Sequence, residues 1–309
     1  MKLEYKILWI DNDLQSYIDN GSVKDIEDFL FARGFEAIIE KVFDEANLEE
    51  FISKHDYDLI ISDYNLEKTT GDVIIEDIRE TRRLDTEILF YTAQGSYKNN
   101  PEVKERLAFI ERLTFQVGRE TLLEKIEKVI ELTLKKLLEL NATRGLITAA
   151  TSDLDGFIEE VFDLVISSPF DDDLIPKVQK IFKTDYKEIK KNLIKKCKAH
   201  RDSHGNDYKQ YFGNSDSFRK WDLLRELTGL KTFDGFDRDL FNKYGEDVIN
   251  IRNKFAHAKA EEVNGKLVLK GQFGKEGFEY DKDACIKIRH DLISHKRNIE
   301  ILRTILESL

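Results

Sequence analysis

Residues 57–71 read Tyr-Asp-Leu-Ile-Ile-Ser-Asp-Tyr-Asn-Leu-Glu-Lys-Thr-Thr-Gly. The short apolar run at its start ends at Asp63, which predicts a buried strand followed by a polar turn. Comparable apolar runs stand at 5–10, 35–42 and 87–92. Segments with helical spacing of apolar residues separate them, at 23–33, 48–54 and 72–82, and a short helix at 101–107 and a fifth strand at 108–112 complete the pattern. Strands that alternate with helices in this way predict a doubly wound α/β fold with a parallel five-stranded sheet.

Polar side chains follow the predicted strands at the point where each one ends. They are Asp11, Asn12 and Asp13 after the first strand, Asp63 after the third, Thr92 after the fourth and Arg112 after the fifth. In open α/β sheets, ligands bind outside the carboxyl ends of the strands. Clustered carboxylates suit Mg²⁺, and a carboxylate beside such an ion can attack phosphorus. A hydroxyl and a guanidinium could then hold the phosphoryl oxygens. The alternative is an ordinary α/β domain whose strand ends are polar.

The same residues give the first part of the chain, about 1–130, a resemblance to the receiver domain of two-component response regulators. Asp63 stands at the phosphoacceptor position, with Leu66 and Gly71 at the offsets found in that family, and 89–93 (Leu-Phe-Tyr-Thr-Ala) matches the strand that carries the switch hydroxyl. The resemblance implies a flavodoxin-like fold and phosphorylation of Asp63 by a cognate histidine kinase. It also implies Mg²⁺ held by Asp11, Asn12, Asp13 and Asp63, and a switch formed by Thr92, Phe109 and Arg112.

Two residues depart from the receiver pattern. The acidic pair is present as Asp11-Asn12, and the usual lysine is present as Arg112. Arginine keeps the positive charge but not the point-like ammonium geometry. A receiver that signals without phosphorylation therefore stays open as an alternative.

Composition places the chain among soluble, two-domain proteins. It has 309 residues, 41% of them hydrophobic and 35% charged, and two cysteines. This excludes a disordered chain and a disulfide scaffold. No apolar run is long enough for a membrane helix, and the opening stretch is too short and too charged for a signal peptide, so we expect a cytoplasmic protein. The first 140 residues carry 19 basic and 31 acidic side chains and the rest 30 and 29, so the acidic half would repel nucleic acid.

Residues 119–140 predict one long amphipathic helix that joins the two halves. We interpret it as a signalling helix that couples the domains or dimerises. The alternative is a rigid spacer that packs on the sheet. No Gly/Ser-rich linker separates the halves.

Residues 141–309 predict a helical bundle with a small hairpin. Helical spacing runs through 147–167, 171–182, 185–200, 218–227, 238–259 and 280–309. The Asn-Gly pair within 263–273 is a hairpin signal. We expect His290 and His295, on the last helix, to be surface residues.

Residues 252–257 read Arg-Asn-Lys-Phe-Ala-His. Asn253 and His257 are four residues apart and share a polar helix face. Histidine moves protons near neutral pH, and Arg252 can hold a phosphate and stabilise a transition state, so these residues suit metal-free phosphodiester chemistry. From the residue types alone, a salt-bridged helix face is the more frequent explanation.

The sequence of this segment resembles the Arg-X4–6-His motif of HEPN domains, with Asn directly after Arg as in the ribonuclease members. The resemblance covers about 141–309. It implies a homodimer in which the motifs of two protomers face one cleft, with Arg252, Asn253 and His257 as the active-site set and no metal cofactor. Many HEPN domains are non-catalytic, and that alternative stays open.

Two weaker patterns fall between 185 and 204. Four lysines on one predicted helix face could contact an RNA backbone, namely Lys187, Lys191, Lys195 and Lys198. The alternative is a solvated face. Cys197, His200 and His204 have a spacing found in metal sites, but no fourth ligand is evident, so we favour solvated side chains over zinc.

The leading hypothesis is a response regulator whose phosphorylation at Asp63 controls an endoribonuclease of the HEPN type, and family resemblance suggests a setting in stress or phage defence. The runner-up is a non-catalytic adaptor whose receiver gates dimerisation or docking. A DNA-binding transcription factor is the weakest hypothesis, because no helix-turn-helix pattern is present and the chain is acidic. We expect a histidine kinase and RNA as partners, and neither a membrane nor a specific DNA site.

Overall fold

The computed structural model describes residues 3–43, 48–54, 57–66, 69–81, 86–92, 110–167, 175–193, 212, 215–271 and 277–308. The chain divides into two compact units, Lys2–Thr143 and Arg144–Leu309. Each unit has its own core and is described separately. Among the described residues, no helix has the length and apolar character needed to cross a lipid bilayer.

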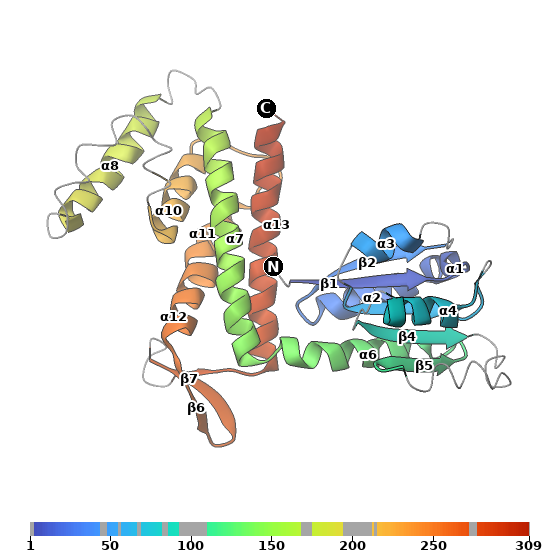
Figure 1. The fold of residues 1–309 in the computed structure, drawn as a ribbon. Coiled ribbons are helices and arrows are strands. Elements are labelled where there is room, and N and C mark those ends of the chain that lie inside the picture. The colour runs from blue at the N-terminus through green and yellow to red at the C-terminus, as the bar shows by residue number, and fades with distance from the viewer. Residues whose placement is uncertain are drawn as a thin grey trace. The chain divides into compact units, whose positions relative to one another are not determined.

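The first unit is built on a five-stranded parallel sheet, which confirms the predicted fold class (Figure 1). Its strands are β1 (Glu4–Ile10), β2 (Glu36–Val42), β3 (Leu59–Asp63), β4 (Glu87–Thr92) and β5 (Leu113–Val117). They lie in the order β2-β1-β3-β4-β5. This is the flavodoxin-like order, in which the direction of winding reverses between β1 and β3. Ligand sites in such sheets lie at the carboxyl ends of those two strands.

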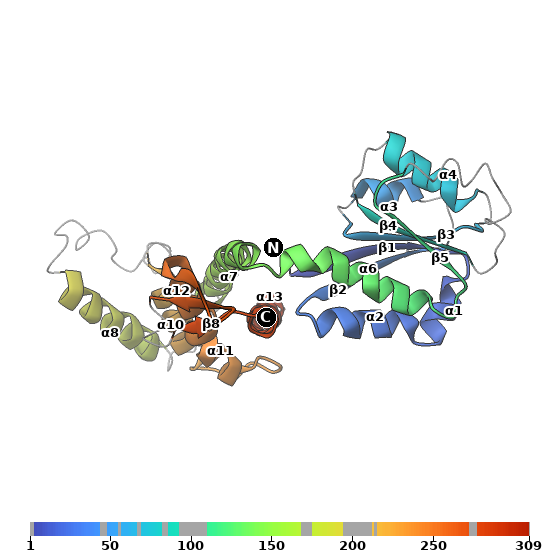
Figure 2. The same cartoon turned by 90° about the horizontal axis from the view of Figure 1, so that it is seen from below.

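Helices cover both faces of this sheet (Figure 2). On one face lie α1 (Leu14–Asp19), α2 (Ser22–Phe31) and α6 (Leu122–Leu137). On the other lie α3 (Leu48–Lys54), α4 (Gly71–Glu76) and its π-helical continuation η2 (Asp77–Thr81). Side chains alternate along β1, so Ile7 and Trp9 face the first group of helices while Leu8 and Ile10 face the second. A strand buried on both faces must be apolar at nearly every position, which explains the unbroken apolar runs in the sequence.

The fifth strand differs from its prediction. It is Leu113–Val117 and not 108–112, because Leu113, Phe115 and Val117 alternate with polar residues while Arg112 has a left-handed backbone with φ of 53°. Arg112 precedes β5, and its carbonyl accepts a hydrogen bond from the Ile88 amide at 3.0 Å. The prediction that Arg112 follows strand five is therefore wrong, since parallel strands begin at the edge of the sheet opposite to Asp63. The predicted helix 101–107 and Phe109 lie outside the described residues.

The second unit is mostly helical with a small antiparallel sheet, as predicted. Its helical elements are α7 (Leu140–Ser167, which begins at the end of the first unit), α8 (Ile175–Leu193), α10 (Ser217–Thr228), α11 (Arg238–Tyr244), η4 (Gly245–Asn250), α12 (Ile251–His257) and α13 (Lys282–Glu307). Figure 1 shows α7 and α13 side by side, and an ion pair of 2.9 Å between Arg303 and Glu160 joins their late turns. A single helix, α8, spans 182–185, where the sequence predicted a break.

The hairpin follows directly on α12. Strands β6 (Lys259–Val263) and β7 (Lys266–Lys270) pair antiparallel, and β8 (Phe278–Glu279) adds to the edge of β7. Asn264 and Gly265 both have positive φ, 54° and 75°, which is the geometry of a type I′ turn. The Asn-Gly signal is thus confirmed, although the strands begin earlier than predicted.

A π-helical stretch, η4, interrupts the helical run from α11 to α12. The Trp221 indole donates a hydrogen bond to the carbonyl of Phe241 at 2.8 Å, and its ring lies over Gly245, where a Cβ atom would come within 2.7 Å of the ring. A side chain that takes a carbonyl out of the helical ladder is a known cause of such irregularities. The π turn rotates α12 relative to α11, so the faces of α12 do not continue those of α11.

Gly71 offers a direct stability test of the first unit. A Cβ atom at this position would overlap the carbonyl oxygen of Asp63 and lie 2.7 Å from Cε2 of Phe90. We expect Gly71→Ala to lower the free energy of unfolding by about 1–3 kcal/mol, as overpacking does. Gly145→Ala is the control, because nothing lies within 4 Å of that Cβ and alanine favours a helix by about 1 kcal/mol. Urea unfolding of the full chain by circular dichroism measures both, and equal stability of Gly71→Ala and wild type would contradict the packing described.

Candidate functional site

The carboxyl edge of the parallel sheet carries the first candidate site. Asp11, Asp63 and Thr92 lie at or directly after the ends of β1, β3 and β4, and all three are buried, with Asp63 only 3% exposed. The sheet thus brings these three predicted residues to one edge, next to the reversal of winding between β1 and β3.

Asp63 is a buried carboxyl group with a raised pKa. Its carboxylate accepts hydrogen bonds from two backbone amides, that of Tyr64 to Oδ1 at 2.8 Å and that of Asn65. Burial raises the pKa of Asp63 to about 6, and the nearby carboxylate of Asp11 adds to the rise, while the amide of Tyr64 and the charge of Arg119 oppose it. A buried carboxyl with a raised pKa at a ligand-binding edge is a candidate reactive group.

Asp11 is held on both of its carboxylate oxygens. The Asp13 amide donates to Oδ1 at 2.7 Å, and the Tyr91 hydroxyl donates to Oδ2. The Trp9 indole in turn donates to the Tyr91 hydroxyl at 3.1 Å. Trp9, Tyr91 and Asp11 therefore form a buried hydrogen-bonded chain that fixes the Asp11 carboxylate. The desolvated hydroxyl beside Asp11 has its pKa raised well above its usual value.

Arg119 supplies the positive charge at this edge. It follows β5, its Nη1 forms an ion pair with Oδ2 of Asp13, and its guanidinium lies 5.5 Å from the centroid of the Tyr17 ring. From the sequence we expected Arg112 in this role, but it precedes β5 and lies at the opposite edge. With the strand placed at Leu113–Val117, Arg119 stands two residues beyond its end, and that placement was the signal that could have found it.

The residues predicted to hold Mg²⁺ only partly converge. Asn12 and Asp13 are exposed, whereas Asp11 and Asp63 are buried. Within the described ranges, no group of three or more His, Cys, Asp or Glu side chains is placed to hold a metal ion. The donors fit Mg²⁺ in kind, because they are carboxylate oxygens, but Tyr91 and Arg119 occupy those of Asp11 and Asp13.

The predicted switch residues are described only in part. The Thr92 hydroxyl lies 3.4 Å from Nδ2 of Asn65, in the turn after β3. An aromatic residue of β5 that the sequence analysis missed, Phe115, packs edge-on against Phe90 with 5.6 Å between ring centroids. The alternation of apolar and polar residues along β5 is the sequence signal that could have identified it.

The second candidate site lies on α12 in the other unit. Asn253 and His257 are exposed and lie about 40° apart around the helix axis, so they share one face as predicted. Arg252 and His257 lie about 140° apart, and no hydrogen bond or ion pair between them occurs in the described structure. One protomer therefore does not place the guanidinium and the imidazole against each other.

Arg252 is anchored within its own unit. Its Nη1 donates to the hydroxyl of Ser217 at 3.1 Å, and its Nε and Nη2 donate to Oδ1 of Asn253 at 3.2 and 3.1 Å. Ser217 in turn donates to Oδ2 of Asp155 at 2.5 Å, and that oxygen lies 3.9 Å from Nη1 of Arg252. Burial raises the pKa of Asp155. The Arg252 side chain is 28% exposed, so the guanidinium is held in place but reachable.

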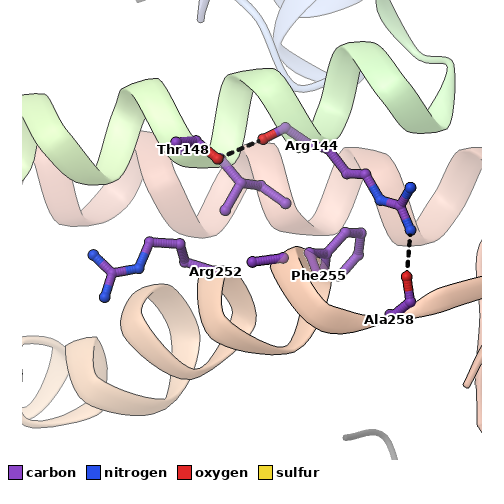
Figure 3. A pocket seen from close by; sticks show the side chains of 7 residues that line it. Arg144, Thr148, Arg252, Phe255 and Ala258 are labelled. Atoms are coloured by element: carbon purple, nitrogen blue, oxygen red, sulfur yellow. Dashed lines mark hydrogen bonds between the residues drawn. The ribbon is translucent and has the colours of Figure 1, made fainter. Parts of the chain in front are cut away.

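A pocket of about 120 Å³ lies between α7 and α12 (Figure 3). Its walls are Ile147, Thr148, Phe255 and Ala256, with Arg144 and Ala258 at one end and Arg252 at the other. Nη2 of Arg144 donates to the Ala258 carbonyl at 2.8 Å, which ties α7 to the end of α12. Figure 3 shows the Arg252 guanidinium directed away from Phe255, and His257 does not line the pocket. Arg252 therefore lines one end of the pocket, whereas Asn253 and His257 are exposed outside it.

His295 is buried, and the expectation that it lies on the surface is wrong. Its Nε2 lies 3.2 Å from Oδ2 of Asp247 in η4, and its ring packs edge-on against Tyr244. Burial lowers the pKa of His295. The error arises because α13 is packed against neighbours on more than one face.

The structure describes little of the four lysines predicted to contact RNA. Lys187 and Lys191 belong to α8, but their side chains lie outside the described structure, as do Lys195 and Lys198 altogether. Cys197, His200 and His204 also lie outside it.

Comparison with known proteins identifies structural neighbours of the N-terminal part of the chain. It is similar to chemotaxis protein CheY4 of Vibrio cholerae, with 24% sequence identity, a TM-score of 0.32, and 41% of this chain and 98% of that one covered. A CheY-like response regulator receiver domain protein of Methanospirillum hungatei shows 21% identity and a TM-score of 0.32 over 43% of this chain and 98% of its own. The response regulator DrrB of Thermotoga maritima, an OmpR/PhoB homolog, shows 17% identity and a TM-score of 0.29 over 42% of this chain and 54% of its own. No protein-family model and no curated protein matches the sequence.

Proposed function

We propose that the chain is a two-component response regulator that receives its signal at Asp63. The observation that carries this proposal is the state of that side chain: it is buried at the end of β3, accepts hydrogen bonds from the backbone amides of Tyr64 and Asn65, and has its pKa raised to about 6 by burial and by the nearby Asp11. At neutral pH the carboxylate form still predominates, so an oxygen of the Asp63 carboxylate can attack phosphorus. The partner would be a histidine kinase, whose phosphoryl group passes from histidine nitrogen to Asp63 as the P–N bond breaks.

Neighbouring groups would stabilise the acyl phosphate. Thr92 is the last residue of β4, and its hydroxyl accepts a hydrogen bond from the side-chain amide of Asn65. This hydroxyl could turn and donate to a phosphoryl oxygen. Asp11 and Asp63 would hold Mg²⁺, with Asp13 joining them after it leaves Arg119, and the ion would supply charge neutralisation for phosphoryl transfer. Arg119 would supply a further positive charge at this edge.

We propose that the second unit is the output, a metal-independent endoribonuclease of the HEPN type that works as a homodimer. The exposure of Asn253 and His257 on one helix face and the anchoring of Arg252 support this proposal. Because Arg252 and His257 diverge around α12, a complete site would need the α12 helices of two protomers. His257 would then accept the proton of the RNA 2′-hydroxyl or donate one to the leaving oxygen, and Arg252 would hold the phosphate.

A non-catalytic adaptor is the second candidate, and a specific observation favours it. The hydrogen bonds of Arg252 to Ser217 and Asn253, with Asp155 nearby, are what a purely structural arginine would make. In that case the second unit would dimerise or dock a partner without cleaving RNA.

Incubation with a small phosphodonor and Mg²⁺ tests the receiver proposal. Wild-type protein should gain one phosphoryl group, as seen by intact-mass spectrometry, and Asp63→Asn should gain none because the nucleophile is removed. Asp19→Asn, an exposed aspartate on α1, is the control and should be labelled like wild type. Equal labelling of Asp63→Asn would move the acceptor elsewhere, and no labelling of wild type would favour a switch that works without phosphorylation.

A further inference from the structure

We infer that Tyr91 and Arg119 set the affinity of the acidic edge for divalent cations, and that cation binding pulls Arg119 away from Asp13 and so acts on the start of α6. The inference deepens the proposed function and rests on the acidic edge being the site of that function. It concerns two residues that hold the carboxylates in place of a cation.

Tyr91 is the first competitor. Its hydroxyl donates to Oδ2 of Asp11, while the Asp13 amide holds Oδ1, so both oxygens of this buried carboxylate are engaged by the protein. A metal ion binds a carboxylate through a lone pair of one of its oxygens. It would bind Asp11 more tightly if no hydroxyl already donated a hydrogen bond to that carboxylate. The Tyr91 hydroxyl cannot turn away without loss, because it also accepts a hydrogen bond from Trp9 inside the core. Cation binding therefore has to work against a fixed hydrogen bond to a charged group.

Arg119 is the second competitor. Its guanidinium is paired with Asp13 and lies over the Tyr17 ring, so its charge stands at the acidic edge. A divalent cation placed there would be repelled by this charge and would displace it from Asp13. The protein thus carries its own counter-charge at the site.

Arg119 links the acidic edge to the start of α6. It lies between β5 and α6, and the first buried residue of that helix, Leu122, packs in the core that also contains Trp9 and Tyr17. Release of Arg119 from Asp13 would free the turn that leads into α6. Because linkage is reciprocal, any state of α6 that holds Arg119 on Asp13 would weaken cation binding.

Cation titration of the full chain tests the inference without relying on phosphorylation. Binding of Mg²⁺ is measured by isothermal titration calorimetry, and binding of Mn²⁺ by the loss of the free-ion signal in electron paramagnetic resonance. We expect Tyr91→Phe to bind roughly tenfold more tightly than wild type, since a hydrogen bond to a charged group is removed. Arg119→Gln should bind several-fold more tightly, with an effect that shrinks at high salt.

Two matched variants serve as controls. Tyr5→Phe removes a buried hydroxyl that pairs with Thr133, and Arg33→Gln removes an arginine paired with Glu131, both in the same unit but away from the acidic edge. Both should bind cations like wild type. Circular dichroism checks that each variant is folded, and Arg119→Gln keeps the test decisive if Tyr91→Phe does not fold, because Arg119 is partly exposed.

The inference is overturned if Tyr91→Phe and Arg119→Gln bind no more tightly than wild type, or if none of the proteins binds a cation. If that happens while Asp63 is still labelled, the response-regulator proposal stands and only the competition is wrong. If the variants bind more tightly but Asp63 is never labelled, the competition stands and the proposed phosphorylation is wrong.

Discussion

Replacing His257 with alanine should reduce RNA cleavage by the purified full-length protein by about 10²–10⁴-fold. This is the range that a positioned general acid or base contributes to a reaction. The expectation follows from the place of His257 on α12, where it is exposed beside Asn253 and absent from the walls of the neighbouring pocket. Cleavage of a fluorescent single-stranded RNA in the presence of EDTA provides the measurement, because the proposed reaction needs no metal.

Three variants show whether the loss is specific. His290→Gln changes another histidine of the same unit, on α13, and should leave cleavage unchanged. Arg252→Ala should be as inactive as His257→Ala, and Arg252→Lys should recover only part of the activity because an ammonium cannot reproduce the hydrogen bonds to Ser217 and Asn253. If wild type and His257→Ala leave RNA equally intact, with Asp63 phosphorylated or free, the adaptor replaces the nuclease as the proposed output.

Mixing the two inactive variants tests the composite site. Arg252 and His257 diverge around α12, so the proposed cleft takes the arginine of one protomer and the histidine of the other. A heterodimer of Arg252→Ala and His257→Ala would contain one cleft with both residues, and activity should return after the variants exchange protomers. Absence of any recovery, with exchange verified by mass spectrometry, would mean that each site is built within one protomer or that no site exists.

The sequence predicted the parallel sheet because its physical signal is strong. Strands buried on both faces, such as β1 and β3, must be continuous apolar runs, and those runs are visible without any structure. The fifth strand was misplaced because its signal is weaker: Leu113–Val117 alternates apolar and polar residues, while the more uniformly apolar 108–110 precedes it. That shift alone sent the cation assignment to Arg112 instead of Arg119.

The candidate sites were less predictable than the fold because their contacts join distant segments. Ser217 and Asp155 are 62 residues apart, and nothing in either local sequence indicates that they meet beside Arg252. Tyr91 reads as an ordinary strand residue, and only the strand order, in which β3 alone separates β4 from β1, brings its hydroxyl to Asp11. His295 shows the same difficulty, since helical spacing does not reveal how many faces of α13 are covered.

Asp63→Asn should stabilise the first unit at pH 8 by up to about 3 kcal/mol and leave its stability unchanged at pH 4. The folded chain raises the pKa of Asp63 from its ordinary 3.8 to about 6, so folding favours the neutral carboxyl. The neutral form predominates in both states below about pH 4, and there the wild type carries no penalty. As pH rises from about 4 to about 6, the unfolded chain ionises while the folded chain keeps its proton beside Asp11, and stability is lost; above about pH 6 both states are ionised and the loss levels off. A difference of about two pKa units corresponds to about 3 kcal/mol. Asparagine has nearly the same shape and never ionises, so the variant avoids this loss.

Urea unfolding of wild type, Asp63→Asn and the exposed control Asp19→Asn, between pH 4 and pH 8, measures this dependence. If the two units unfold in separate transitions, the shift caused by Gly71→Ala identifies the transition of the first unit. The stability difference between Asp63→Asn and wild type should grow between pH 4 and about pH 7 and then level off, while Asp19→Asn follows wild type throughout. A constant difference would mean that the Asp63 carboxyl ionises in the folded chain as easily as in water. The aspartate would then be neither desolvated by the ends of β1 and β3 nor coupled to Asp11, and the electrostatic case for it as the reactive group would be lost.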